Sequence, residues 1–171
     1  MRTVVSDLLV EMQDVSLGYT ETPVLTHVNL EIGRGELVVI AGASGCGKST
    51  MLKGTIGLLR PLAGRINLLG TDLEGLSEEK LASLRSRIGL LFQGGALLNS
   101  MSVAANVALP IEQHARLPSG AVDKLVRMKL ALVGLEDHGN KLPSELSGGM
   151  RKREALARAM ALDPDLLLCD E

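Results

Sequence analysis

The residues best suited to chemistry form one short glycine-rich stretch, Gly42 to Thr50, with the sequence GASGCGKST. It fits the phosphate-binding pattern G-x-x-x-x-G-K-[ST], with Gly42, Gly47, Lys48 and Ser49 at the defining positions. Glycines permit backbone torsions that turn successive N–H groups inward around phosphate oxygens. The lysine places a cation on the β- and γ-phosphates, and the serine hydroxyl is placed to bind Mg²⁺. This P-loop predicts that the chain binds a nucleotide, or descends from one that does.

The segments on either side of the P-loop have the character needed to position it. Leu37 to Ala41 is an unbroken apolar run, which predicts a strand buried on both faces that leads into the loop. Met51 to Leu59 has helical apolar spacing, and Arg60-Pro61 should end that helix. A helix N-terminus would add its positive end to the phosphate site. This strand–loop–helix context favours a phosphate site over a glycine-rich turn that binds nothing.

The segment before the P-loop alternates with period two. Apolar and polar residues alternate within residues 8–32, which predicts two half-buried antiparallel strands. Gly18, Tyr19 and the turn-forming Thr20–Pro23 lie between them. Tyr19 and Phe92 are the only aromatic residues, so the core must consist of aliphatic side chains and methionine.

After the P-loop helix the pattern changes twice. Gly64–Leu69 and Ile88–Phe92 read as short strands, separated by a helix with Ser77 as N-cap that extends to about Arg87. Residues 96–145 then show helical spacing, punctuated by prolines at 110, 118 and 143. One apolar stripe in this region predicts a packing surface and comprises Val122, Leu125, Val126, Leu130 and Val133.

The end of the chain carries a second set of candidate site residues. Leu146–Met150, LSGGM, opens a helix that extends to about Leu162. The basic residues 151–153 that follow could be a phosphate-binding patch, although a solvated helix face is the preferred interpretation. Leu166–Glu171, LLLCDE, is an apolar strand that ends in two acids. After a P-loop, a carboxylate here is expected to hold Mg²⁺ and the next one to polarise the attacking water as a general base.

Composition excludes several classes of protein. The 171 residues suffice for one domain with subdomains, and 18 basic against 20 acidic residues give a net charge of −2, which does not favour nucleic acid as a partner. No apolar run has the length of a membrane span, so a soluble, cytoplasmic protein is expected. Cys46 and Cys169 have no metal-ligand spacing and are interpreted as free thiols.

The P-loop, Gln93, LSGGM and LLLCDE together resemble the ATP-binding subunit of an ABC transporter, and this resemblance covers essentially the whole chain. It implies a P-loop NTPase (RecA-like) α/β core with an N-terminal antiparallel β-subdomain and a helical subdomain. It further implies that Tyr19 stacks on adenine, that Gln93 is the family's Q-loop residue, and that the signature LSGGM faces ATP bound by a second protomer. The implied catalytic residues are Lys48, Gln93 and Glu171. The implied Mg²⁺ ligands are Ser49, Gln93 and Asp170. The implied ATP-binding residues are Tyr19, Gly42, Ser44, Gly45, Cys46, Gly47, Lys48, Ser49, Thr50, Ser147, Gly148 and Gly149.

Met150, in place of the usual glutamine of the signature, and the Arg-Lys-Arg that follows are similar to the Mla/Mce-type subgroup. That subgroup moves phospholipids or other hydrophobic molecules between bacterial envelope membranes. The resemblance implies a head-to-tail homodimer and a transmembrane permease that docks near Gly94 to Pro110. It also implies a location on the cytoplasmic face of the inner membrane.

The sequence is expected to be one partial domain, 1–171. It comprises a β-subdomain with the P-loop core (8–95), a helical subdomain (96–150), and a last segment (151–171). This last segment holds the signature helix and the strand LLLCDE, which matches the family's Walker B strand. The family continues with a further strand and a switch histidine, and that strand separates the P-loop and Walker B strands. An incomplete sheet with unpaired edges is therefore expected, and with it low stability and no activity of these residues alone.

Two alternatives remain open. A soluble, non-transport ABC-type ATPase usually carries coiled-coil, basic or tandem-domain additions, and none is found in the 171 residues. An inactive fragment is the other alternative. For single residues, Gln93 could simply cap a strand end, and Tyr19 could belong to the core.

Overall fold

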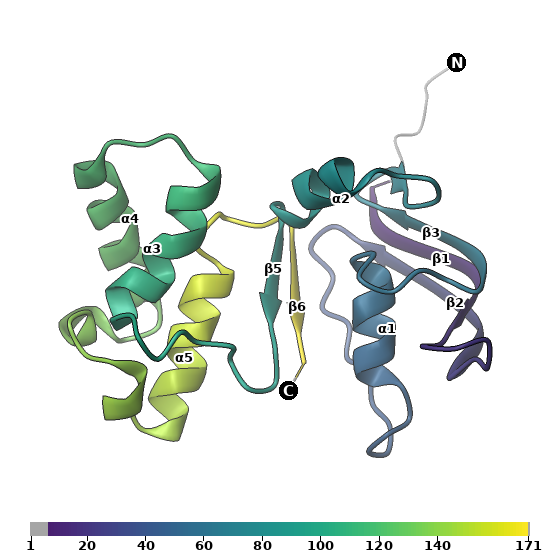
Figure 1. Cartoon of the computed structure of the whole chain (residues 1–171), viewed down its shortest axis with the longest axis horizontal. Helices are drawn as coiled ribbons and strands as arrows, with labels where there is room; N and C mark the ends of the chain where they lie inside the picture. Colours follow the sequence, from purple (N-terminus) through teal and green to yellow (C-terminus); the bar gives the residue numbers. More distant parts are fainter. Residues whose placement is uncertain (1–6, 171) are drawn as a thin grey trace. The chain divides into compact units, whose positions relative to one another are not determined.

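The computed structural model describes residues 7–170 and divides the chain into two compact units, which meet in sequence between Arg85 and Ser86 (Figure 1). The first unit contains an antiparallel sheet. Its strands are β1 (Leu8–Leu17), β2 (Leu25–Gly33), β3 (Ala63–Leu68) and β4 (Thr71–Asp72), in the order β2-β1-β3-β4. The predicted hairpin and the predicted strand at 64–69 are confirmed.

The alternation in the sequence corresponds to the buried face of this sheet. Met12 pairs with Leu30 on one side and with Ile66 on the other. Its neighbours in sequence, Glu11 and Gln13, are partly or fully exposed, whereas Met12 is buried. The core of the sheet consists of aliphatic and methionine side chains, as expected from the scarcity of aromatics: Val10, Met12, Val15, Leu17, Ile66 and Leu68.

The P-loop helix, α1 (Lys48–Thr55), packs against β1. A Cβ added to Gly54 would lie 2.6 Å from the Leu17 side chain, so glycine at this position allows the close approach. The helix ends earlier than predicted. Gly57 has a φ of +66° and the Leu58 N–H bonds to the Lys53 carbonyl oxygen, a glycine-containing helix end, so Arg60-Pro61 is not what stops it.

The segment before the P-loop differs from the prediction. Leu37–Ala41 is not a strand, and its apolar side chains are exposed, with 93% of Leu37 and 80% of Val39 accessible to solvent. A strand requires a neighbouring strand for its backbone hydrogen bonds. Among the strands of residues 7–170, none pairs with this segment. The predicted burial on both faces is therefore wrong for this structure, and the expectation of an incomplete sheet agrees with it.

The helix α2 (Glu78–Arg85) closes the first unit. Ser77 accepts from the Leu81 and Lys80 N–H groups through its carbonyl and hydroxyl oxygens, which confirms it as the helix start. Arg85 donates to the carbonyl oxygens of Ile56 (3.0 Å) and Gly57 (2.8 Å). The last turn of α2 is thereby fastened to the end of α1.

The second unit combines a two-stranded parallel sheet with helices. β5 (Ile88–Leu91) pairs with β6 (Leu166–Cys169) in register, Leu91 opposite Cys169. The helices are α3 (Val103–His114), α4 (Ser119–Leu132) and α5 (Gly148–Ala159), with short 3₁₀ turns η1 (Glu136–His138) and η2 (Pro143–Glu145) between α4 and α5. The predicted helical region and both predicted strands are confirmed.

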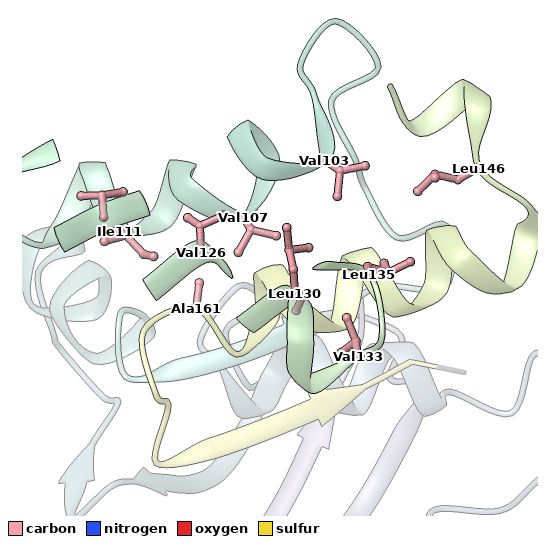
Figure 2. Close-up of a cluster of buried hydrophobic side chains, with 11 residues drawn as sticks. Val103, Val107, Ile111, Val126, Leu130, Val133, Leu135, Leu146 and Ala161 are labelled. Carbon is pink, nitrogen blue, oxygen red and sulfur yellow. The ribbon is translucent and has the colours of Figure 1, made fainter. Parts of the chain in front are cut away.

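The helices of this unit share one hydrophobic core. Figure 2 shows its side chains converging from α3, α4, α5 and the segments around η1 and η2. The predicted stripe on α4 lies in it, with Leu125 at its edge. Pro110 lies inside α3 and does not end it. The core comprises Val103, Val107, Ile111, Val122, Val126, Leu130, Val133, Leu135, Leu146, Ala157 and Ala161.

Two further expectations concern the whole chain. Cys46 and Cys169 are both free thiols, as predicted. No helix within residues 7–170 has the length and apolar character needed to cross a membrane. The 8–95 and 96–150 subdomain limits follow motifs rather than packing, and they stay predictions.

Candidate functional site

The P-loop is an exposed loop that enters α1 through glycines in the left-handed region. Gly45 has a φ of +79° and Gly47, the N-cap of α1, a φ of +101°. A Cβ added at Gly45 would meet nothing within 4 Å, so space is open beside the backbone there. No side chain caps the N-terminus of α1. The loop therefore presents backbone at a helix start that lacks a side-chain acceptor, which is the arrangement a phosphate group can complete.

Lys48 folds back over the P-loop. Its ammonium donates to the carbonyl oxygens of Gly42 (2.9 Å) and Ala43 (3.0 Å) and lies 3.9 Å from the Cys46 Sγ. The Cys46 N–H bonds to the Ala43 carbonyl oxygen at 3.2 Å. These bonds hold the loop closed around its own lysine. The predicted cation of the site is thus positioned at the phosphate-binding loop.

Tyr19 lies in the turn after β1, and it is 59% exposed, which excludes an ordinary core role. Its hydroxyl accepts from the Lys53 ammonium at 3.1 Å. Hydrogen bonding to the Thr50 side chain and then to Lys53 lowers the pKa of Tyr19 below its ordinary value. The tyrosine is therefore connected directly to the helix that begins at the P-loop.

Gln93 and Asp170 lie at one edge of the parallel sheet. β5 and β6 run in the same direction with Leu91 opposite Cys169, so the residues that follow the two strands leave the sheet together. The Asp170 N–H bonds to the Leu91 carbonyl oxygen at 2.8 Å, which extends the pairing by one residue. The structure thus places two of the predicted Mg²⁺ ligands at the same sheet edge. Glu171, the predicted base, lies outside the described residues.

The signature LSGGM begins α5. Ser147 is the N-cap, and its hydroxyl accepts from the Met150 N–H at 3.3 Å. Gly148 and Gly149 are exposed, and a Cβ added to either would meet nothing within 4 Å. Leu146, just before, is buried in the helical core. The signature is therefore an exposed helix start that directly follows a buried core residue.

The basic residues after the signature have two different roles. Arg151 and Lys152 are exposed and line a groove of about 460 Å³ with Gly148, Pro143, the segment Leu91–Leu97 and Asn99. Arg153 instead donates to the carbonyl oxygens of Val133 (2.7 Å) and Gly134 (3.1 Å), at the end of α4. The prediction of a solvated face holds for the first two. Arg153 is exposed as well, and its guanidinium additionally bonds to the end of α4, because a helix end offers acceptors that a cation satisfies.

Two residues that sequence reasoning missed support the site. Arg158 on α5 donates to the carbonyl oxygens of Ala96 (2.7 Å) and Gly95 (2.9 Å), just after Gln93, and burial lowers its pKa. Lys53 holds Tyr19 as described above. Both act through the chain fold rather than through a local motif. No local sequence signal marks either contact, because Lys53 and Arg158 reach residues 34 and 62 or 63 positions away.

Glu154 is an anomaly on the signature helix. Its side chain is fully buried, and neither carboxylate oxygen has a hydrogen-bond partner within residues 7–170. Burial raises the pKa of this carboxyl, and Arg158 one turn further on opposes part of that rise. Its burial could not be predicted, because a glutamate at this spacing looks like part of a charged helix face.

The predicted site residues thus form separate groups within the two units. The first unit holds the P-loop residues and Tyr19, joined through α1. The second holds Gln93 with Asp170 at the sheet edge, and Ser147, Gly148 and Gly149 at the start of α5. No group of three or more His, Cys, Asp and Glu side chains suited to a metal gathers in the described part of the chain.

The ABC transporter family model matches residues 25–171. The chain is 44% identical over 163 residues to the intermembrane phospholipid transport system ATP-binding protein MlaF of Haemophilus influenzae, covering 95% of this chain and 62% of that protein. It is also 44% identical over 162 residues to the "Probable ribonucleotide transport ATP-binding protein mkl" of Mycobacterium bovis, covering 95% of this chain and 45% of that protein. The chain therefore spans less than two thirds of the length of these relatives.

Solved structures share the fold. The ATP-binding cassette MJ0796, a dimer in a post-hydrolysis state with ADP and Pi, is 33% identical with a TM-score of 0.88, covering 95% of this chain and 73% of that one. The cbiO1 protein of Clostridium perfringens, part of the ABC transporter complex cbiONQ, is 31% identical with a TM-score of 0.86, covering 96% and 66%. The predicted α/β fold class, with its antiparallel and helical subdomains, is confirmed. Since the family model covers most of the chain and its P-loop and signature lie at helix starts of a shared fold, the chain belongs to the ABC transporter family.

Proposed function

We propose that this chain binds and hydrolyses ATP as the nucleotide-binding subunit of an ABC transporter. The observation that carries the proposal is the P-loop itself, with its left-handed glycines and the Lys48 ammonium held on the loop carbonyl oxygens. On arrival of the triphosphate, the ammonium exchanges these carbonyl partners for phosphate oxygens, which are stronger acceptors for a cation. The exposed N–H groups of the loop and of the first turn of α1 complete the phosphate site. Ser44, Gly45, Cys46 and Thr50 supply further parts of this cradle.

The donor atoms of Ser49, Gln93 and Asp170 suit Mg²⁺. A hydroxyl, an amide oxygen and a carboxylate are hard oxygen ligands of the type that Mg²⁺ takes, alongside substrate phosphates. The common sheet edge of Gln93 and Asp170 supports pairing these two residues at one ion. When bound, the ion would neutralise charge on the β- and γ-phosphates. Glu171, next to Asp170, is proposed to orient the attacking water and accept its proton.

The signature at Ser147, Gly148 and Gly149 is proposed to complete the nucleotide site of a second copy of the chain. The open space at both glycines and the exposed helix start support contact with an anion from outside the chain. The dimeric state of the similar cassette MJ0796 supports the same arrangement. Two copies arranged head to tail would then enclose ATP between the P-loop of one and the signature of the other.

A permease is proposed to dock on the surface after Gln93. The groove lined by Leu91–Leu97 and by Arg151 and Lys152 supports this assignment, because it is open and carries two cations. Arg158 fixes the carbonyl oxygens of Gly95 and Ala96 at the wall of this groove. A change at Gln93 on nucleotide binding would therefore reach the docking surface through a fixed backbone.

The proposed cargo is a phospholipid or another hydrophobic solute. The Met150 signature and the 44% identity to a phospholipid transport protein over 95% of the chain support this choice. The name of the mycobacterial relative indicates ribonucleotides instead. In a complex reconstituted with its permease, phospholipid vesicles should stimulate ATP turnover and added ribonucleotides should not; the reverse pattern would overturn the assignment.

The catalytic proposal has its own test. In a subunit extended to the full length of the family and assembled with its permease, Glu171→Gln should retain ATP binding and abolish turnover. Bound nucleotide recovered from this variant should be ATP rather than ADP. Unchanged turnover would remove Glu171 from the mechanism, and loss of ATP binding would show that the residue serves the fold instead.

A further inference from the structure

Lys53 makes a contact that the proposed ATP site does not explain. It lies on α1, five residues beyond Lys48, and its ammonium donates to the Tyr19 hydroxyl at 3.1 Å. The same nitrogen lies 5.2 Å from the centre of the Tyr19 ring, within the range of a cation–π interaction. Both residues belong to the first unit, so the contact lies inside one compact body.

The two distances define how the ring is held. Because the ammonium is nearer the hydroxyl oxygen than the ring centre, it lies toward the hydroxyl end of the ring and does not cover its middle. With 59% of Tyr19 exposed, aromatic surface remains for another planar group to stack on. Thr50, also on α1, forms a second side-chain hydrogen bond with Tyr19. The tip of the ring is thus anchored to the P-loop helix, and its surface stays accessible.

Anchoring is needed because Tyr19 follows β1 in an irregular turn. Leu17 and Leu25 are paired at the two ends of this turn. Between them, the described residues show one backbone hydrogen bond across the turn, from the Val24 N–H to the Leu17 carbonyl oxygen. An exposed aromatic side chain in such a turn would have to be ordered when a ligand binds, at a cost in affinity. A ring already held by its hydroxyl avoids most of that cost.

We propose that Lys53 is a positioning residue for the base half of the nucleotide site, which holds the Tyr19 ring in the orientation that stacks on a purine. This inference rests on the proposed function, since it presupposes a nucleotide on the P-loop. It assigns Lys53 to the base alone. The phosphates belong to Lys48, at the other end of α1.

The binding test separates the two halves of the ligand. Equilibrium dissociation constants of ATP and of inorganic tripolyphosphate are measured for the chain extended to the full length of the family and for its variants, because the 171 residues alone are expected to have low stability. Lys53→Met should weaken ATP binding by about three- to tenfold, the range of an aromatic contact, and leave tripolyphosphate binding unchanged. Lys53→Arg should restore most of the ATP affinity, because it keeps a cationic donor. Lys80 is exposed on α2, outside the proposed site. Lys80→Met removes the same charge there and should change neither dissociation constant.

Two variants distinguish failure of this inference from failure of the proposed function. Lys48→Ala should weaken both ligands, and Tyr19→Ala should weaken ATP alone, on the order of tenfold. If the unmodified chain binds neither ligand, the proposed function fails. If Tyr19→Ala weakens ATP but Lys53→Met does not, the proposed function stands and the positioning role is wrong. Equal weakening of both ligands by Lys53→Met would also contradict it, since the residue would then serve the phosphates.

A spectroscopic titration reports the contact itself. Tyr19 is the only tyrosine among the 171 residues, which include no tryptophan, and the part of the phenolate absorbance in the near ultraviolet that Tyr19→Phe removes follows this side chain. Thr50 and Lys53 lower the pKa of Tyr19, and Lys53→Met should therefore raise it. Lys80→Met should leave the titration in place. A titration curve that Lys53→Met does not shift would overturn the proposed contact whatever the binding data give.

Discussion

The P-loop and the signature are both glycine-rich helix starts, yet they are built in opposite ways. The P-loop follows the exposed segment Leu37–Ala41, has no side-chain cap, and is held by the Lys48 ammonium. The signature follows the buried Leu146, is capped by the Ser147 hydroxyl, and begins a helix that packs into the core of its unit. The P-loop is held closed by the Lys48 side chain, which a bound phosphate would draw away from the loop carbonyl oxygens. The signature is anchored in its own unit before any ligand arrives.

This difference suggests a division of work. A loop held closed by its own lysine can rearrange around a triphosphate, because the bonds that close it are exchanged rather than lost. A capped helix start on a packed base keeps its geometry and can recognise an anion presented to it. The proposed head-to-tail dimer would then combine one adaptable surface and one rigid surface at each nucleotide.

The largest expected effect separates the two helix starts by ligand. Lys48→Ala should weaken ATP binding to the chain extended to the full length of the family, without its permease, by about 10- to 100-fold, the value of hydrogen bonds from a charged group. Ser147→Ala should leave that affinity unchanged, because the signature is proposed to contact the nucleotide of another copy. Titration of both variants with a fluorescent ATP analogue measures the difference. A comparable loss in Ser147→Ala would mean that one copy uses both helix starts on the same nucleotide.

Most of the fold could be predicted because its signals are local. The alternation of residues 8–32 and the α4 stripe each record which face of one element is buried. Ser77 and Ser147 cap helices through atoms a few residues away. Leu37–Ala41 failed for the converse reason. Its apolar run describes a strand, but a strand exists only with a neighbour, and none of the described strands supplies one.

Candidate site residues could be predicted from the sequence, whereas the residues that support them could not. Motif spacing and the family resemblance predicted Lys48, Gln93, Asp170 and the signature glycines, and their roles stay predictions. Neither could reveal that Lys53 reaches Tyr19 or that Arg158 reaches the carbonyl oxygens after Gln93, because these contacts join residues 34 and 62 or 63 positions apart. Long basic side chains have many possible partners, and only the fold selects among them.

The next expected effect concerns Glu154, the buried carboxylate on the signature helix α5. Replacing the buried, unpaired Glu154 by Leu should raise the free energy of unfolding by about 1–3 kcal/mol at neutral pH, the cost of an unsatisfied buried polar group. The exposed Glu112 on α3, changed to Leu, is the control and should have little effect. Chemical denaturation monitored by circular dichroism measures both. A destabilised Glu154→Leu would show that the carboxylate has a partner that stabilises it.

Glu154 also predicts a pH dependence with a definite sign. Its pKa is raised in the folded state above the ordinary 4.5, so the folded chain binds the proton more tightly than the unfolded chain does. The corresponding stability is present below the ordinary value and is lost as pH rises through the raised folded pKa. Glu154→Gln should remove this contribution. A pH profile that stays the same in Glu154→Gln would assign the dependence to other groups.

A smaller effect should distinguish the two helix caps. Ser147→Ala removes the hydroxyl that accepts from Met150 and should cost about 1 kcal/mol of stability, whereas Ser147→Asp should keep the cap. In the P-loop, Ser44→Ala should cost almost nothing, because no side chain caps α1. The midpoints of denaturation compare the three variants. Equal losses at Ser44 and Ser147 would remove the contrast between an uncapped and a capped helix start.

The smallest expected effect is local and concerns the cation that holds the segment after Gln93. The Arg158 guanidinium reaches the carbonyl oxygens of Gly95 and Ala96 together, as the Lys48 ammonium reaches those of Gly42 and Ala43. Arg158→Lys keeps the charge but replaces the two guanidinium nitrogens that reach these oxygens with one nitrogen on a differently shaped side chain, so the pair of bonds should be weakened by about 0.5–1.5 kcal/mol. Amide exchange in residues 94–97 should accelerate by about two- to tenfold while the rest of α5 is unchanged. Arg153→Lys is the matched control, since the Arg153 bonds go to Val133 and Gly134 and any change in amide exchange should appear at the end of α4 instead. If Arg158→Lys leaves amide exchange after Gln93 unchanged, that segment is held by its own turn. Its similarity to the P-loop, which the Lys48 ammonium holds, would then be only geometric.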